Sequence, residues 1–356
     1  MSRPWPEDLT LTRVWFNQTF SNVRAVLDLI RQGDADAEFC LICTHPDPGF
    51  PGFLAADEHA LEPPRLSGAD YVEFCLEFCR THRIEALWPG KEATLLVEQR
   101  ARFAAIGVQV LAVATPQVLG LLYDKARFAL EASRFHIPTP ATIAFRTADE
   151  FESAYERLRS IHEVLCLKPA KGVNGEGFRV IREEHAGLDG LVRDGLYSIR
   201  LGCLRQLLVQ HPPEQTWLLM EYLAGDEYSL DAVGDGQRLI ALTQRCKRAG
   251  GAYGQRIVAR PELTQAVSEL TGHFGLSGLF NVQFREGSHG PRLLEVNPRF
   301  SGGIGYTGPT GLNLPYLALR GLIRGFNAQD SRDAPRLAPE MRVLELTQYQ
   351  HHGGAV

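Results

Sequence analysis

Short apolar runs alternate with helical patterns along the first third of the chain. The runs at residues 13–16, 39–43 and 84–88 are dominated by apolar side chains, as expected of buried strands. Between them, residues 23–31 and 71–82 repeat their apolar positions at the spacing of a helix. Such alternation predicts a small parallel sheet with helices on both faces.

The turns after the first and third of these strands are places where a parallel sheet presents residues to a ligand. Residues 17–22 read Asn-Gln-Thr-Phe-Ser-Asn, without the Gly-x-Gly-x-x-Gly pattern of a dinucleotide site, so no dinucleotide is expected. Residues 90–92 read Gly-Lys-Glu. Lys91 and Glu92 fit a ligand contact and an ordinary solvated turn equally well.

A glycine-rich turn separates two short apolar strands, residues 165–170 and 178–181. The turn carries Gly172, Gly175 and Gly177. Glycines let backbone N–H groups approach phosphate oxygens, and Lys168 could place a charge on the same anion. The turn is not a P-loop, because Gly-x4-Gly-Lys-Ser/Thr is missing and a strand follows instead of a helix. A plain hairpin would explain the glycines equally well.

Residues 217–233 read as an apolar strand, a glycine turn and a strand with polar residues at alternate positions. The linker after the first strand could offer backbone N–H and C=O groups to an adenine edge. Glu227 could accept hydrogen bonds from ribose hydroxyls. Taken alone, the segment also fits an exposed hairpin whose acidic residues serve solubility.

Polar side chains interrupt two apolar segments late in the chain. Glu295 and Asn297 are two positions apart and project from one face of a strand. Gln283 lies mid-strand, where a neutral polar group is costly unless it is paired or binds something. If the strands are neighbours, these oxygens converge and suit Mg²⁺ that keeps positions for water and phosphate. A polar-faced hairpin would explain Glu295 alone, but the whole set, with Arg299 just past the strand, favours a metal–phosphate site.

Composition limits the classes of function. At 356 residues the chain can bury sizeable cores, in about two or three subdomains. The formal net charge of −5 gives no general attraction to nucleic acid or anionic membranes. No apolar run approaches the roughly 18 residues of a membrane helix, and residues 1–8 lack the apolar core of a signal peptide. We expect a soluble cytoplasmic protein that binds neither nucleic acid nor membrane.

The seven cysteines are odd in number and scattered, which argues against a disulfide framework. Cys40 and Cys43 have CxxC spacing, and Cys75 and Cys79 lie one helical turn apart, so zinc binding is one interpretation. Strand residues 40 and 43 point to opposite faces, however, and buried free thiols are the simpler interpretation.

The order and spacing of the three polar segments resemble the ATP-grasp superfamily, in particular the single-module proteins similar to one half of the large subunit of carbamoyl-phosphate synthetase. The resemblance runs from about Tyr123 to Arg320 and continues weakly over the N-terminal third. Residues 124–128, followed by residues 136–140, look like the entry motif of that family, where Lys125 reaches the nucleotide.

The resemblance implies an ATP site. Lys168 would contact the α-phosphate and adenine, and the turn from Gly172 to Gly177 would form a flexible lid over the β- and γ-phosphates. The remaining contacts implied for ATP are adenine binding by Glu221, Tyr222 and Leu223, and ribose binding by Glu227.

The same resemblance implies Mg²⁺ (or Mn²⁺) ions held by Gln283, Glu295 and Asn297. Glutamine at position 283 is specific to the synthetase-like branch, since many relatives carry a carboxylate there. Arg299 would face the transferred phosphate or the acyl group. Four cations lie where relatives have a basic loop near the phosphates: Arg245, Lys247, Arg248 and Arg256. The candidate catalytic cations are Arg299, Arg248 and Lys168, and which cation of the basic loop contacts ATP stays open.

The expected fold is α/β, with a Rossmann-like parallel domain before an ATP-grasp fold of two subdomains with antiparallel sheets. The expected boundaries are 1–120 for the parallel domain, 121–325 for the ATP-grasp domain (lid 140–212, metal-binding part 213–325) and 326–356 for the C-terminal segment. In such enzymes the first domain usually shapes one wall of the acceptor pocket. Residues 302–315 look like a loop that could close on the acceptor or be a plain connection.

The function implied is an ATP-dependent ligase that joins a small carboxylate to an amine through an acyl phosphate. A kinase or carboxylase acting on a hydroxyl or bicarbonate and a nucleotide-binding regulator without turnover are the alternatives. The chain shows no second ATP-grasp half and no glutaminase-type nucleophile elbow, so we do not expect the bifunctional synthetase itself. A homodimer would be common for the superfamily, but no interface is identified.

Overall fold

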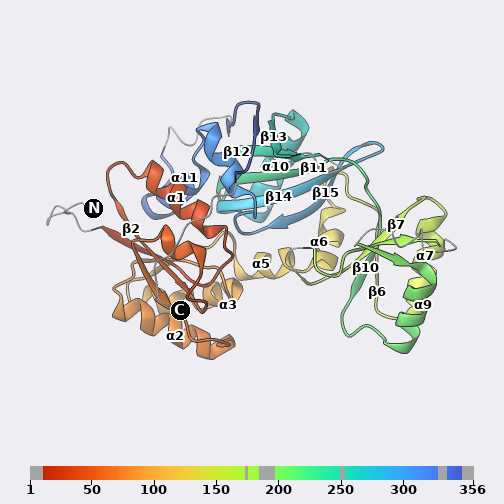
Figure 1. Ribbon diagram of the computed structural model, residues 1–356, viewed down its shortest axis with the longest axis horizontal. Helices are drawn as coiled ribbons and strands as arrows, with labels where there is room; N and C mark the ends of the chain where they lie inside the picture. Colours follow the sequence, from red (N-terminus) through yellow and green to blue (C-terminus); the bar gives the residue numbers. More distant parts are fainter. Residues whose placement is uncertain (1–10, 173–174, 184–196, 249–252, 328–334, 347–356) are drawn as a thin grey trace. The chain divides into compact units, whose positions relative to one another are not determined.

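The computed structural model describes residues 11–172, 175–183, 197–248, 253–327 and 335–346. The chain forms two compact units (Figure 1). The first unit combines Met1–Ala114, Tyr228–Asn281 and Arg299–Val356. The second unit combines Thr115–Glu227 and Val282–Pro298.

A five-stranded parallel sheet forms the N-terminal part of the first unit, in the order β3-β2-β1-β4-β5. Its strands are β1 (Thr12–Phe16), β2 (Phe39–His45), β3 (Glu58–Leu61), β4 (Ala86–Trp88) and β5 (Gln109–Val110). The helices are α1 (Val23–Gly33), α2 (Gly68–Thr81), α3 (Ala93–Glu98) and α4 (Arg100–Ala104), and the 3₁₀ helix η1 (Pro51–Leu54) follows β2. The predicted parallel sheet is confirmed.

The period of the strands explains why this sheet is covered on both faces. Val14 and Phe16 of β1 belong to a buried cluster with α1 and α11 (Leu314–Arg324), whereas Trp15 belongs to a second cluster with α2. Alternate residues of a strand point to opposite faces, so one strand contributes to two cores. Cys43 lies in the first cluster and Cys40 in the second, both as buried free thiols.

A second sheet has the order β15-β14-β11-β12-β13-β17, with β16 beside β12, and its strands other than β15 (Gly290–Asn297) and the end of β14 belong to the first unit. Its strands are β11 (Glu227–Asp235), β12 (Leu239–Lys247), β13 (Gln255–Val258), β14 (Ser277–Gly287), β16 (Arg336–Leu337) and β17 (Met341–Val343), and α10 (Pro261–Phe274) packs against β12. Residues 302–315, expected as a loop, contain the 3₁₀ helix η2 (Ile304–Thr310). The hydroxyls of Thr307 and Thr310 stabilise it, because each donates to the carbonyl three residues earlier, at 2.7 and 2.6 Å.

The second unit contains a five-stranded sheet in the order β6-β10-β7-β8-β9. Its strands are β6 (Thr142–Phe145), β7 (Leu165–Pro169), β8 (Arg179–Arg182), β9 (Ser198–Arg200) and β10 (Trp217–Glu221). Helices α7 (Ala148–Arg159) and α9 (Leu201–Gln210) cover one face, as Figure 1 shows. The remaining elements are α5 (Pro116–Leu122), α6 (Lys125–Ala132) and β15 (Gly290–Asn297), which pairs with the end of β14. Among the described helices, none is long and apolar enough to cross a bilayer.

Candidate functional site

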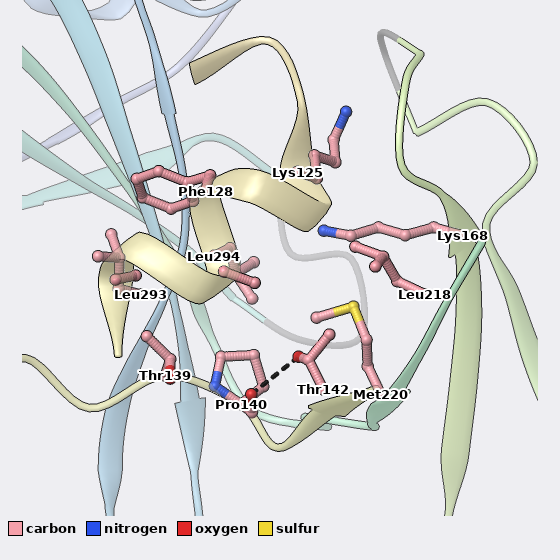
Figure 2. Close-up of a pocket in the computed structure, with 12 residues that line it drawn as sticks. Lys125, Phe128, Thr139, Pro140, Thr142, Lys168, Leu218, Met220, Leu293 and Leu294 are labelled. Atoms are coloured by element: carbon pink, nitrogen blue, oxygen red, sulfur yellow. Dashed lines mark hydrogen bonds between the residues drawn. The ribbon is translucent and has the colours of Figure 1, made fainter. Parts of the chain in front are cut away.

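The face of this sheet that α7 and α9 leave uncovered carries a pocket (Figure 2). On β10, Leu219 packs toward the helices, whereas Leu218 and Met220 line the pocket. This division follows from the two-residue period of a strand. The pocket is partly open to solvent, and its other walls come from α6, residues 139–142, β7 and β15. Its lining is largely apolar, with two lysines among the lining residues, Lys125 and Lys168.

Lys125 is the first residue of α6. Asp124 caps this helix, since its carboxylate accepts from the N–H groups of Ala126 and Arg127 at 3.1 Å each. The Lys125 N–H donates to the Ala170 carbonyl at 2.9 Å, and its ammonium donates to the Gly172 carbonyl at 2.6 Å. The cap therefore places this lysine against the glycine turn.

Lys168 projects from β7 into the pocket between Leu218 and the first turn of α6 (Figure 2). Burial lowers the pKa of Lys168 from its ordinary value, and the neighbouring Lys125 charge acts in the same direction. The Glu295 carboxylate opposes both effects. A half-buried lysine in such a place stabilises an anion strongly, because little water competes for it.

The glycine turn requires its glycines. Gly172, Gly175 and Gly177 have φ angles of 148°, 72° and 73°, which residues with side chains rarely adopt. A Cβ on Gly177 would also lie 2.8 Å from Cδ of Pro169. Residues 173 and 174 lie outside the described residues, so the phosphate-lid prediction concerns a turn of which only the flanks are described.

The linker after β10 leaves one buried donor for a ligand. The N–H groups of Glu221 and Tyr222 donate to the carbonyls of Ala141 and Val164 at 2.9 and 3.0 Å. Leu223 is buried, and within the described residues its N–H has no hydrogen-bond partner. A buried N–H without a partner is costly, so this group suits the acceptor nitrogen of a purine edge.

The carboxylate of Glu221 is engaged by neighbouring protein groups. It accepts from the Ala141 N–H at 3.3 Å and lies 3.9 Å from Nδ1 of His162. The carbonyl of Glu221 accepts a weak thiol hydrogen bond from Cys166, at 3.7 Å. The backbone of Glu221 therefore suits ligand binding better than its side chain. Glu227, predicted to hold ribose, is the half-buried first residue of β11.

The predicted metal ligands lie on the adjacent strands β14 and β15. Asn297 donates from its side-chain amide to Oε1 of Glu295 at 2.9 Å, which brings two oxygen-bearing groups together. Gln283 is half-buried on β14, beside them in the sheet order. No group of three His, Cys, Asp or Glu residues in the described chain could hold a metal. The predicted set of Gln283, Glu295 and Asn297 is not a group of that kind, because two of its three members are amides and only one is a carboxylate.

Arg245 of the predicted basic loop is fully buried and engaged by protein groups. Its Nε donates to Asp231 Oδ2 at 2.8 Å and its Nη1 to Gln255 Oε1 at 2.7 Å. Its Nη2 donates to the hydroxyls of Ser229 and Ser301 at 2.8 and 2.7 Å. With its side chain at zero exposure and these protein partners, Arg245 fits a structural role better than phosphate binding.

The other predicted cations of the first unit are accessible. Arg248 follows β12 and is exposed, Lys247 ends β12 and is half-buried, and Arg256 on β13 is exposed. Arg299 is half-buried, and its guanidinium lies 5.4 Å from the ring centroid of Phe20. The second unit thus gathers the lysines, the glycine turn, the linker and the metal ligands, while Arg248 and Arg299 belong to the first unit.

Two features were missed from the sequence. The first is the apolar pocket wall, for which the alternation along β10 was a usable signal. The second is the network around Arg245, in which Asn281 donates to Ser229, to the Leu230 carbonyl and to Asp231. Its signal was the spacing of Ser229 and Asp231, two apart and hence on one face of β11.

Sequence comparison matches a family model and distant curated relatives. A family model described as "ATP-grasp in the biosynthetic pathway with Ter operon" matches residues 213–349. The carbamoyl phosphate synthase large chain of Corynebacterium glutamicum is 24% identical over 336 residues, and the match covers 90% of this chain. The chain spans only 28% of the length of that relative.

Several solved structures share the fold. The biotin carboxylase domain dimer of the Hydrogenobacter thermophilus 2-oxoglutarate carboxylase, in complex with Mg-ADP, ADP and bicarbonate, matches with a TM-score of 0.63 and 17% identity, over 91% of this chain and 71% of that one. The L-amino acid ligase from Bacillus licheniformis matches with a TM-score of 0.61 and 13% identity, over 90% and 76%. The sheet order, the family match over residues 213–349 and these structures agree with the predicted resemblance, and the chain has an ATP-grasp-like fold.

Proposed function

We propose that the protein is an ATP-dependent ligase that joins a carboxylate substrate to an amine and releases ADP and phosphate. The observation that carries the proposal is the set of groups that the second unit brings together. One compact body holds two lysines at an apolar pocket, a glycine turn in left-handed conformations and the Glu295–Asn297 pair. A nucleoside triphosphate with a divalent cation is bound by groups of this kind.

The pocket fits ATP in its chemistry. Its apolar walls suit a purine, and the unpartnered Leu223 N–H and the Glu221 carbonyl suit the hydrogen-bonding edge of adenine. Glu227 would hold the ribose. Lys168 and Lys125 would bind phosphate oxygens, and Lys125 would exchange its bond with the Gly172 carbonyl for one with phosphate. Gly175 and Gly177 would approach the phosphates with their backbone.

The metal ligands fit Mg²⁺ because they are hard oxygen donors with a single carboxylate among them. Gln283, Glu295 and Asn297 would hold the ion, and Asn297 would turn its amide oxygen toward it. When bound, Mg²⁺ neutralises charge on the phosphoryl group during transfer.

The reaction would proceed in two displacements. The substrate carboxylate attacks the γ-phosphorus of ATP in line, which forms an acyl phosphate and releases ADP. The neutral amine then attacks the acyl carbon, phosphate leaves with the bonding electrons, and the amine proton goes to solvent. Lys168, Arg248 and Arg299 are the proposed cations that stabilise charge in the first step. Such catalysis works through positioning and electrostatics, so it requires no catalytic His or Cys.

The comparisons support a ligase without identifying its substrates. The Bacillus licheniformis structure is named an amino acid ligase, and the matching family model is described with a biosynthetic pathway. One observation favours the second candidate, a carboxylase-type reaction. The Hydrogenobacter thermophilus domain, which shares the fold, was solved with bicarbonate.

The test is ADP and phosphate release from Mg-ATP, screened against pools of amino acids and small carboxylates. We expect release that requires both a carboxylate and an amine and that produces an amide by mass spectrometry. Glu295→Ala should abolish release while the fold survives, and Glu214→Gln, at an exposed position of the second unit, should retain it. Release with bicarbonate alone or a phosphorylated product would overturn the ligase, and ATP binding without release would favour a regulator.

A further inference from the structure

The turns after β1 and β4 are joined by buried hydrogen bonds. Asn17, at zero exposure, accepts from the Gly90 N–H and donates to the Lys91 carbonyl at 3.0 Å. The Lys91 N–H donates to the Gln18 carbonyl at 2.7 Å. Because β1 lies between β2 and β4, the two turns mark the point where the strand order reverses, which is where open α/β sheets bind ligands.

Glu62 makes this junction rigid. Its buried carboxylate accepts from the Gln18 N–H at 2.7 Å, from the Tyr71 hydroxyl at 2.9 Å and from the Thr44 hydroxyl. Tyr71 in turn accepts from Asn17 at 3.0 Å. Every group of this network has a hydrogen-bond partner, so the network orders the turns without needing a ligand of its own.

The Lys91 ammonium takes no part in this hydrogen-bond network. It lies 4.8 Å from the ring centroid of Tyr71, a cation–π contact, and the side chain is half-buried. Within the described residues it has no hydrogen-bond or ion-pair partner, although an ammonium has three donors. The next residue, Glu92, is strained at a φ of 54°. Strain of this kind gathers at ligand sites, where the surroundings impose it.

A second cation lies at the other end of the same loop. Asn22 donates to the Ser301 carbonyl at 2.6 Å, which ties residues 17–22 to the segment after Arg299. The Arg299 guanidinium lies over Phe20 of this loop. The backbone of Lys91 thus contacts Asn17 and Gln18, and Arg299 contacts Phe20 of the same short loop at the carboxyl edge of the parallel sheet.

We propose that Lys91 binds a second anionic group of the acceptor. The acceptor would then carry two anionic groups, a carboxylate together with a further carboxylate or a phosphate ester, and it is called a dianion for these two groups. The inference rests on the proposed function, in which Arg299 faces the reacting carboxyl group. Lys91 would receive the anion that does not react. It would act as a specificity residue, since a monoacid leaves its ammonium without a partner.

The test is isothermal titration in the absence of nucleotide, with butyrate, glutarate and 3-phosphoglycerate as probes. These carry one carboxylate, two carboxylates, and a carboxylate with a phosphate ester. Wild-type protein should bind one dianion at least about tenfold more tightly than butyrate, as a charge-assisted hydrogen bond provides. Lys91→Gln should abolish the difference and Lys91→Arg should restore part of it. Arg100→Gln, which removes an exposed charge of α4, should retain it.

Equal affinity of the wild type for all three probes, or a dianion preference that survives in Lys91→Gln, would overturn the inference. The results that would reject the ligase differ from those that would reject the Lys91 site. Lys91-dependent dianion binding without ADP release would reject the ligase and keep the site. ADP release with a monoacid, at a KM that Lys91→Gln leaves unchanged, would reject the site and keep the ligase.

Discussion

Replacement of Arg245 by methionine tests whether a cation in a predicted phosphate loop is a structural group. Methionine fills a similar volume but removes the donors to Asp231, Gln255 and the two serine hydroxyls. The Asp231 carboxylate, itself at zero exposure, would then lie buried without a counter-charge.

Breaking a buried ion pair by removing one partner costs about 3–5 kcal/mol, because the remaining charge is not solvated. In a unit of this size, each kcal/mol shifts the melting temperature by about 2–4 °C, so we expect a drop of roughly 6–20 °C. The double variant Arg245→Met/Asp231→Asn, which leaves no buried charge, should lose less than Arg245→Met alone.

The assay is urea and thermal unfolding followed by circular dichroism. Arg248→Met is the matched control, since Arg248 is exposed three residues away and should change stability by less than about 0.5 kcal/mol. The reasoning would be refuted if Arg245→Met unfolded like the wild type but bound ATP more weakly. That result would make Arg245 a phosphate ligand.

Three further predictions follow from burial and backbone geometry. Burial lowers the pKa of Lys168 below 10.5, so the charged form of this lysine destabilises the nucleotide-free fold. In urea unfolding, Lys168→Met should therefore be at least as stable as the wild type at pH 7, and the difference in stability should shrink as the pH rises toward 10.5. The same variant should bind ATP more weakly. Gly177→Ala should raise the KM for ATP more than Gly175→Ala, because both positions have φ near 72–73° but only Gly177 approaches Pro169; equal effects would contradict this. Cys203 is exposed and the other six cysteines are buried, so thiol titration of the native protein at pH 8 should find one fast-reacting group.

The local elements were predictable because each is encoded by a short pattern. The spacing of Val23, Val26, Leu27 and Ile30 predicts the buried side of α1, and all four are buried. The polar residues Glu295 and Asn297, at alternate positions of an apolar run, likewise predicted β15, and the structure brings their side chains into contact. Patterns of this length need no knowledge of distant parts of the chain.

The role of Arg245 could not be predicted from its own neighbourhood. Its partners lie 10 to 56 positions away, on β11, on β13 and after β15, and only the assembled sheet shows that they enclose the guanidinium. A cation near glycines looks the same in sequence whether it faces phosphate or protein. The Lys91 site is similar, since its partners Tyr71 and Asn17 come from separate elements.

The central claim is that the ATP site activates a carboxylate as an acyl phosphate. The most direct measurement uses an acceptor whose carboxylate is labelled with oxygen-18, together with Mg-ATP and the amine found in the screen. Attack of the carboxylate on the γ-phosphorus transfers one labelled oxygen to the released phosphate, so mass spectrometry should find phosphate with a single oxygen-18. Release of unlabelled phosphate at the same rate as amide formation would contradict the account.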